Sequence, residues 1–134
     1  MNELETSIFT LLTGGTALTA KLATTTSIYP YVAPLGAAFP LVIFNLQGGG
    51  DTNDTPRRNK DLVYQVKAVS DTTKFLAGEV DTEIDNLLHE TVLTVSGWTN
   101  YWCARETDIG YQESKDGAIY WHVGGLYRIR LDKG

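Results

Sequence analysis

The side chains that could perform chemistry are few and lie far apart in the sequence. The chain has two histidines, His89 and His122, and one cysteine, Cys103. A nucleophilic triad needs a histidine as its general base, and neither histidine stands in an HxH or HExxH spacing that would bind a metal. His89 falls at the end of a predicted helix, and Cys103 is flanked by aromatic and apolar residues, as expected of a small buried hydrophobe. We therefore predict no catalytic residue, no metal site, no cofactor and no enzymatic activity.

Basic and aromatic side chains indicate contacts with other macromolecules. Arg57 and Arg58 with Lys60 form the only basic cluster in the first two-thirds of the chain. Two interpretations stay open for this cluster: a soluble loop tip, or a contact with an acidic partner or nucleic acid. Alternation along the last predicted strand places Tyr120, His122, Arg128 and Arg130 on one face, and arginine is favoured at protein interfaces. The candidate interface residues are Arg57, Arg58, Lys60, Tyr120, His122, Arg128 and Arg130.

Two further patterns could bind ions or nucleotides but lack the required context. The run 48–50 is three glycines, yet no GK[ST] ending and no helix follow it, so it is not a phosphate-binding loop. An acidic set occupies every second position of the long predicted helix. Residues i and i+2 diverge by about 200° around a helix, so the set does not form one metal-binding face. Its members are Glu79, Asp81, Glu83 and Asp85.

The composition bounds the class of protein. The 134 residues are 43% hydrophobic, which predicts one folded domain spanning 1–134. A net charge of -5 and a pI near 4.9 argue against a DNA-coating protein. One cysteine allows no intramolecular disulfide, and no apolar run approaches the roughly 18 residues of a membrane helix. The N-terminal residues lack a signal peptide's basic head, so we expect synthesis in the cytoplasm and no membrane partner.

Hydrophobic periodicity predicts the elements that position these residues. We expect an α+β fold: a mostly antiparallel four- to five-stranded sheet with one long helix and a short N-terminal helix packed on one face. The glycine-rich, polar segment 47–59 is predicted to be a long mobile loop. The predicted elements are helices at 3–12, 16–22 and 70–90, and strands at 28–32, 39–46, 62–69, 98–106 and 118–131.

The order of these elements resembles one virus protein family. The segments that carry the resemblance are AFPLVIFN, a proline followed by an apolar strand; a polar loop; the strand DLVYQVKAVS; the helix TTKFLAGEVDTEIDNLLHE; and the final strand GGLYRIRL. Together they cover nearly the whole chain and resemble the tail terminator, or tail completion, family of bacteriophages with long non-contractile tails.

The resemblance implies a structural virion protein at the head-proximal end of the tail. Members of that family form a six-membered ring that stops growth of the tail tube and offers the docking surface for the head. The implied partners are further copies of the chain, the tail-tube protein and the head-completion protein, while genomic DNA passes through without specific binding. Because like charges repel, the acidic set could line the channel for DNA.

Two alternatives stay open. The first is another phage connector or tail-tube subunit, such as a head-closure protein. The second is a small ligand-binding or enzymatic α+β domain with a pocket between the long helix and the sheet, lined by Tyr64, Trp102 and Trp121.

Overall fold

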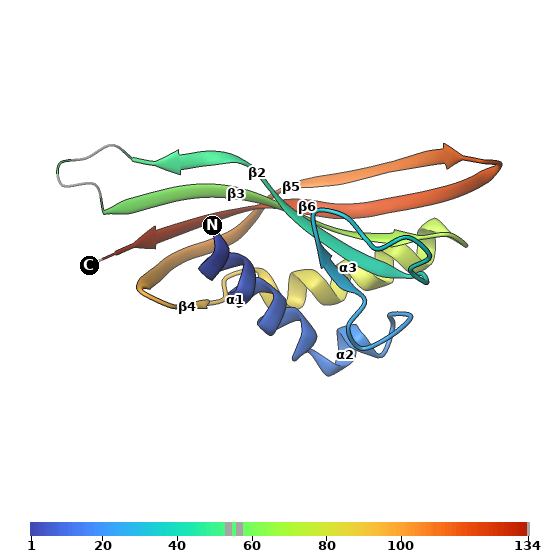
Figure 1. The fold of residues 1–134 in the computed structure, drawn as a ribbon, viewed down its shortest axis with the longest axis horizontal. Coiled ribbons are helices and arrows are strands. Elements are labelled where there is room, and N and C mark those ends of the chain that lie inside the picture. Colours follow the sequence, from blue (N-terminus) through green and yellow to red (C-terminus); the bar gives the residue numbers. More distant parts are fainter. Residues whose placement is uncertain (53–54, 56–57, 134) are drawn as a thin grey trace.

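The computed structural model describes residues 1–52, 55 and 58–133, and it shows a single twisted sheet with helices on one side (Figure 1). The sheet has six strands in the order β1-β2-β3-β6-β5-β4. All neighbours pair antiparallel except β1, which runs parallel to β2. The strands are β1 (Ile28–Pro30), β2 (Leu41–Asp51), β3 (Asn59–Ser70), β4 (Thr94–Val95), β5 (Trp98–Lys115) and β6 (Ala118–Asp132).

Three helices cover one face of this sheet: α1 (Asn2–Thr13), α2 (Thr16–Thr19) and α3 (Lys74–Leu88). The N-cap of α3 is Thr73, whose hydroxyl accepts a hydrogen bond from the Leu76 amide at 3.1 Å. Apolar side chains at helical spacing on α1 and α3 pack against alternate residues of the strands. The fully buried side chains include Leu4, Ile8, Leu12, Val80, Ile84, Leu88, Tyr64, Val66, Tyr127 and Ile129.

The predicted fold class was wrong in its strand number, its pairing and its helices. The sheet has six strands rather than four or five, and it is mixed because Ile28–Pro30 pairs parallel with β2. The fold class named one long and one short helix, whereas the described residues form three, because the helix predicted at 16–22 is present as the short α2. Proline at position 30 is tolerated because β1 is the outermost strand, where a missing donor breaks no ladder. The two-residue strand β4 is too short to give a periodic signal.

The predicted loop at 47–59 was also too long. Residues 47–51 continue β2, with Gly48, Gly49 and Gly50 paired to β3, and Asn59 already belongs to β3. The register shifts between Leu46 and Gly48, and Gly49 adopts a positive φ of 91°. A β-bulge with glycine at a left-handed position explains how this polar segment stays in the sheet. Residues 53, 54, 56 and 57 lie outside the described part of the chain.

The long hairpin of β5 and β6 is the most extended feature of the molecule (Figure 1). Asp116 and Gly117 form the turn of this hairpin, with φ angles of 53° and 80°. Strand β5 runs nine residues beyond the predicted end at 106, and it carries two register shifts against β6. The hairpin tip projects past the helices in this view.

Candidate functional site

The face of the sheet that lies opposite the helices gathers most of the predicted interface residues. Side chains at even positions of β6 point to this face, which we call the outer face, because odd positions such as Tyr127 and Ile129 are buried under the helices. Tyr120, His122, Arg128 and Arg130 therefore share the outer face, as predicted from the alternation in the sequence.

Arg128 and Arg130 belong to an ion-pair cluster on the outer face. Arg128 donates to Asp61 Oδ1 at 2.8 Å and to Glu106 Oε1 at 2.9 Å, and these hydrogen bonds raise the pKa of the guanidinium. The Arg130 Nε lies 3.5 Å from Asp61 Oδ2, and its guanidinium carbon is 5.8 Å from the Trp102 ring centroid. Both arginines are partly exposed, so an acidic group of a partner could also form an ion pair with them.

The other predicted basic residues lie at the end of the sheet where β2 and β3 meet. Lys60 Nζ bonds Asp51 Oδ1 at 2.8 Å and stands 5.9 Å from the Trp98 ring centroid. The exposed Arg58 is held through its carbonyl, which accepts a hydrogen bond from the Lys133 amide at 2.8 Å. Arg57 lies outside the described residues. A contact of the basic cluster Arg57, Arg58 and Lys60 with an acidic partner or nucleic acid stays a prediction.

Tyr120 and His122 line a groove of about 700 Å³ on the outer face near the hairpin tip. Its other wall is the segment 31–40, which packs on the sheet through Phe39, whose ring centroid lies 5.2 Å from that of Tyr120. His122 is only 7% exposed and stacks on Tyr111, with ring centroids 4.4 Å apart. The His122 Nε2 faces Glu113 Oε1 at 3.3 Å, whereas Nδ1 is buried without a hydrogen-bond partner.

The burial of His122 in this groove predicts that the fold loses stability at acidic pH. Burial and the nearby charge of Lys67 lower the pKa of His122, while Glu113 partly opposes this shift. Tyr111 stacks on the ring, and Asp71, Lys115 and Tyr120 are further titratable residues that line the same groove. The unfolded chain, whose histidine pKa is about 6.5, therefore binds more protons than the folded chain just below that pH. We expect this contribution to stability to be complete above about pH 6.5 and to be lost as the pH falls through the lower folded pKa.

Urea unfolding of the wild type and of His122→Phe at pH 7.5 and pH 5.0 tests this expectation. The phenylalanine keeps the stacking on Tyr111 but does not titrate. The loss of unfolding free energy on acidification should be smaller in the variant than in the wild type. Equal losses in both proteins would show that His122 does not cause acid sensitivity.

The predicted acidic set divides into two groups. Glu79 is exposed, and Glu83 and Asp85 are half-buried, so these three stay candidates for lining a channel. Asp81 is buried and accepts a two-pronged ion pair from Arg105, with Nη1–Oδ1 and Nη2–Oδ2 distances of 2.9 Å each. Asp85 accepts a hydrogen bond from the Tyr127 hydroxyl at 3.1 Å. The prediction that Asp81 faces a channel was wrong, because its carboxylate is used inside the subunit.

Arg105 was not identified from the sequence, although it joins α3 to the sheet. Its guanidinium also donates to the Gly124 carbonyl at 2.6 Å and to the Tyr127 hydroxyl at 3.3 Å. Burial lowers its pKa, but the hydrogen bonds to Asp81 and Tyr127 outweigh burial and raise it overall. The available signal was that Arg105 follows Cys103 by two residues, which places it on the buried face of the strand.

The aromatic residues proposed to line a ligand pocket do not come together. Tyr64 is fully buried and donates to Glu5 at 2.8 Å, Trp121 packs against the core, and Trp102 is 47% exposed on the outer face. The pocket required by the second alternative is therefore not formed by these three side chains. Cys103 is buried as predicted, donates to the Leu88 carbonyl at 3.2 Å, and has its thiol pKa raised to about 12 by burial.

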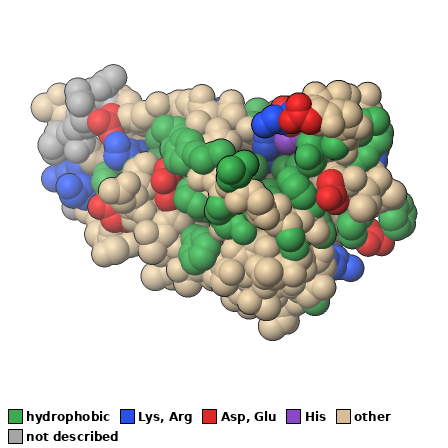
Figure 2. All heavy atoms as spheres, turned by 45° about the vertical axis from the view of Figure 1, so that its right-hand side comes forward, with side chains coloured by type: hydrophobic (Ala, Val, Ile, Leu, Met, Phe, Trp, Pro, Cys, Tyr) green, Lys and Arg blue, Asp and Glu red, His purple; other side chains and the backbone are tan. Residues whose placement is uncertain are grey.

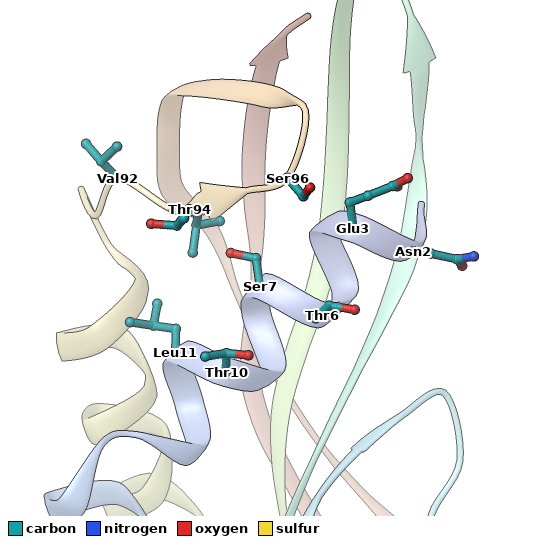
Figure 3. A pocket seen from close by; sticks show the side chains of 10 residues that line it. Asn2, Glu3, Thr6, Ser7, Thr10, Leu11, Val92, Thr94 and Ser96 are labelled. Carbon is teal, nitrogen blue, oxygen red and sulfur yellow. The ribbon is translucent and has the colours of Figure 1, made fainter.

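A cavity near the helices lies between α1 and the segment that leads into β4 (Figure 3). It measures about 740 Å³, and Ser7, Thr10 and Leu11 of α1 face Val92 and Thr94 across it. Its lining residues include one titratable group, Glu3, so no acid–base pair converges there.

His89 accepts a hydrogen bond from the Arg105 amide at 3.1 Å as the C-cap of α3, which confirms its predicted place at the end of that helix.

Residues 1–52, 55 and 58–133 form neither a metal-ligating cluster nor a membrane-spanning helix. No group of three or more His, Cys, Asp or Glu side chains there could hold a metal ion. Among the helices described, none has the length and apolar character needed to cross a membrane.

Comparison with known proteins gives a match in structure but not in sequence. No protein-family model matches the chain, and no curated protein sequence matches it. Its fold is similar to that of a chain in the virion of a native gene transfer agent (GTA) particle, with a TM-score of 0.81 and 15% sequence identity. The superposition covers 96% of this chain and 94% of that chain, so the two share one fold from end to end.

Proposed function

We propose that this chain is a non-enzymatic structural protein of a phage-like virion. The observation that carries the proposal is the end-to-end fold similarity to a chain of the gene transfer agent virion, at a TM-score of 0.81. The sequence pattern supports it independently, because the order of strands and helices resembles a family of virion proteins. Large exposed apolar residues add support, since a protein that assembles needs surfaces to bury.

The finer proposal is that the chain is a tail terminator. In this role six copies form a ring on the head-proximal end of the tail tube, stop its growth and provide the docking surface for the head. Its partners are then its own copies, the tail-tube protein and the head-completion protein. The acidic side chains of Glu79, Glu83 and Asp85 would face the passing DNA, and the net charge of -5 favours passage without binding.

Two measurements test this function. Light scattering over a concentration series, with negative-stain images of the largest species, should show a discrete ring of six subunits with a central hole, alone or after addition of tail-tube protein. The ring should also block further growth when it is added to polymerising tube protein. Long tubes formed by the purified chain would instead identify a tube subunit, and failure to bind tube ends would contradict the terminator role.

A further inference from the structure

Strand β5 has an open edge over the half that leads to the hairpin tip. Strand β4 covers only its first two residues, and the segment after α3 continues along β5, where the Glu90 amide donates to the Cys103 carbonyl at 2.7 Å. The last contact on this side is the Arg105 amide, which donates to a side chain of that segment. From Thr107 to Lys115, β5 has β6 on one side and no described strand on the other (Figure 1). Every residue of this stretch except Ile109 is exposed, so the edge is accessible.

The turn of the hairpin fixes which backbone groups point out from this edge. Asp116 and Gly117 both have positive φ angles, as in a two-residue type I′ turn, and Lys115 pairs with Ala118. The pair that flanks such a turn is hydrogen-bonded, and hydrogen-bonded and non-hydrogen-bonded pairs then alternate along the ladder. Odd positions of β5 from 107 to 115 therefore bond β6, while the amides and carbonyls of the even positions face the open edge. These positions are Asp108, Gly110, Gln112 and Ser114.

Two features that usually protect an edge strand are absent here. Residues 107–115 contain no proline, and their ladder with β6 has no register shift after Thr107. Figure 2 shows this end of the molecule, where hydrophobic side chains lie beside charges of both signs, so the surface favours no single side-chain chemistry. A regular row of outward backbone groups is instead specific for an extended strand, which adds to the sheet.

A second copy of this chain has one strand that matches this edge. Among the strands described, β1 has three residues and ends in proline, and β4 has two residues. The open side of β2 is interrupted by the register shift between Leu46 and Gly48. The β5 edge is therefore the long and regular edge that a second copy can offer.

We propose that the open edge of β5 pairs antiparallel with the same edge of a second copy, about a two-fold axis at Tyr111. Gly110 of one copy then faces Gln112 of the other, and Asp108 faces Ser114. Each of these pairs exchanges two backbone hydrogen bonds, because both members point their amides and carbonyls outward. The two Tyr111 rings, each 46% exposed, face each other at a non-hydrogen-bonded position, where cross-strand side chains lie closest.

This register opposes no like charges within residues 107–115. On the face that carries Tyr111, Glu113 lies opposite Ile109 and Lys115 lies opposite Thr107. On the other face, the carboxylate of Asp108 lies opposite the Ser114 hydroxyl. At each end, Lys115 and Asp116 of one copy come beside Glu106 and Asp108 of the other, so attraction and repulsion offset each other there.

A shift of the axis by one residue makes the pairing worse in either direction. An axis at Gln112 sets Asp108 opposite Asp116, which are like charges. An axis at Gly110 sets Lys115 opposite Arg105, whose amide is already bonded to the segment after α3. The axis at Tyr111 therefore gives the longest ladder without such a conflict.

The inference goes beyond the proposed function. A two-fold contact joins the same patch of two copies and does not by itself build a ring, which needs two different patches. The pair of copies covers the β5 edge in the free protein, where an open edge favours aggregation.

Proline substitution at the edge tests the contact. Gln112→Pro removes an outward amide and no bond to β6, and proline is tolerated at such a position of an edge strand. Wild-type protein should form dimers by sedimentation velocity over a concentration series. The variant should associate at least about tenfold more weakly, because the two-fold axis removes the donor twice. Gln112→Thr keeps the amide and is the matched control, which should dimerise like the wild type.

Far-UV circular dichroism shows whether Gln112→Pro keeps the fold, and Ser114→Pro makes the same test at the next outward position. Wild-type protein that stays monomeric at every concentration would overturn the proposal. A folded proline variant that dimerises as tightly as the wild type would overturn it as well.

Disulfide trapping tests the register. Tyr111→Cys places a thiol opposite its own counterpart, with Cβ atoms about 4.5–5.5 Å apart, and should form a disulfide-linked dimer in oxidised glutathione. Lys115→Cys is the matched control on the same face, since its counterpart lies eight positions away, about 26 Å along the strands. The native Cys103 is buried and does not compete. Equal cross-linking of the two variants, or none by Tyr111→Cys, would overturn the register.

Assays with tail-tube protein separate this inference from the proposed function. Wild-type protein that stays monomeric yet blocks tube growth would overturn the inference and leave the terminator role standing. A β5-linked dimer that never binds tube ends would support the inference and contradict the terminator role. If wild-type protein stays monomeric and Gln112→Pro loses binding to the tube protein, the edge binds a strand of that protein and not a second copy.

Discussion

Replacement of Arg105 by methionine is expected to lower the free energy of unfolding by about 3–5 kcal/mol, because the substitution leaves a buried charge without its partner. The carboxylate of Asp81 receives two hydrogen bonds from this guanidinium, and both side chains are only 12% exposed. Methionine keeps the length and apolar stem of arginine but offers no donor. Equilibrium unfolding in urea, with wild type and variant compared at the same pH, measures the loss.

A double variant separates the buried charge from simple loss of packing. Arg105→Met combined with Asp81→Leu removes both charges, so it should recover a large part of the stability that the single variant loses. Arg128→Met is the matched control, since its ion pairs to Asp61 and Glu106 are partly exposed and should contribute about 0–1 kcal/mol. Equal losses of unfolding free energy in Arg105→Met and Arg128→Met would show that the buried pair of Arg105 and Asp81 stabilises the fold no more than the exposed ion pairs of Arg128.

Local patterns in the sequence identified most of the elements but not the sheet they form. Alternation along 62–69 and 118–131 placed β3 and β6 and the faces of their side chains, because a period of two is a local property. The parallel pairing of Ile28–Pro30 with β2 and the two-residue β4 depend on contacts between distant segments. The glycine-rich end of β2 was predicted as a loop because its own residues carry no strand signal. It is held in the sheet by backbone pairing with β3, which a local pattern does not show.

The sequence predicted on which face the surface residues lie, but it did not predict which residues they pair with. Alternation correctly placed Tyr120, His122, Arg128 and Arg130 on one face, yet their partners Asp61, Glu106 and Glu113 come from other strands. The acidic helix shows the same limit, since Asp81 and Glu79 look equivalent in sequence and differ only because β5 presents Arg105 to one of them. Charge on a helix predicts a solvated face until a neighbouring strand supplies a counter-ion.

Replacement of Gly124 by alanine is expected to lower the free energy of unfolding by about 3 kcal/mol, at the upper end of the range for overpacking. A Cβ at this position would stand 2.3 Å from the Val66 carbonyl oxygen and 2.5 Å from the Lys67 Cα. Both atoms belong to the backbone of β3, so the clash cannot be relieved by rotating a side chain. Strands β3 and β6 would have to separate, and the Gly124 carbonyl would move away from the Arg105 guanidinium that donates to it.

Gly110→Ala is the matched control for this prediction. Gly110 lies in the same hairpin, opposite Val123, but the nearest atom to its added Cβ is the His122 carbonyl oxygen at 3.9 Å, an ordinary contact. Alanine there should leave stability unchanged or raise it by about 0.4–1 kcal/mol through lower entropy of the unfolded chain. Since both variants add one methyl group to the same sheet, a difference between them measures the close approach of β3 and β6. Similar stabilities of the two variants would mean that the strands can part without cost at Gly124.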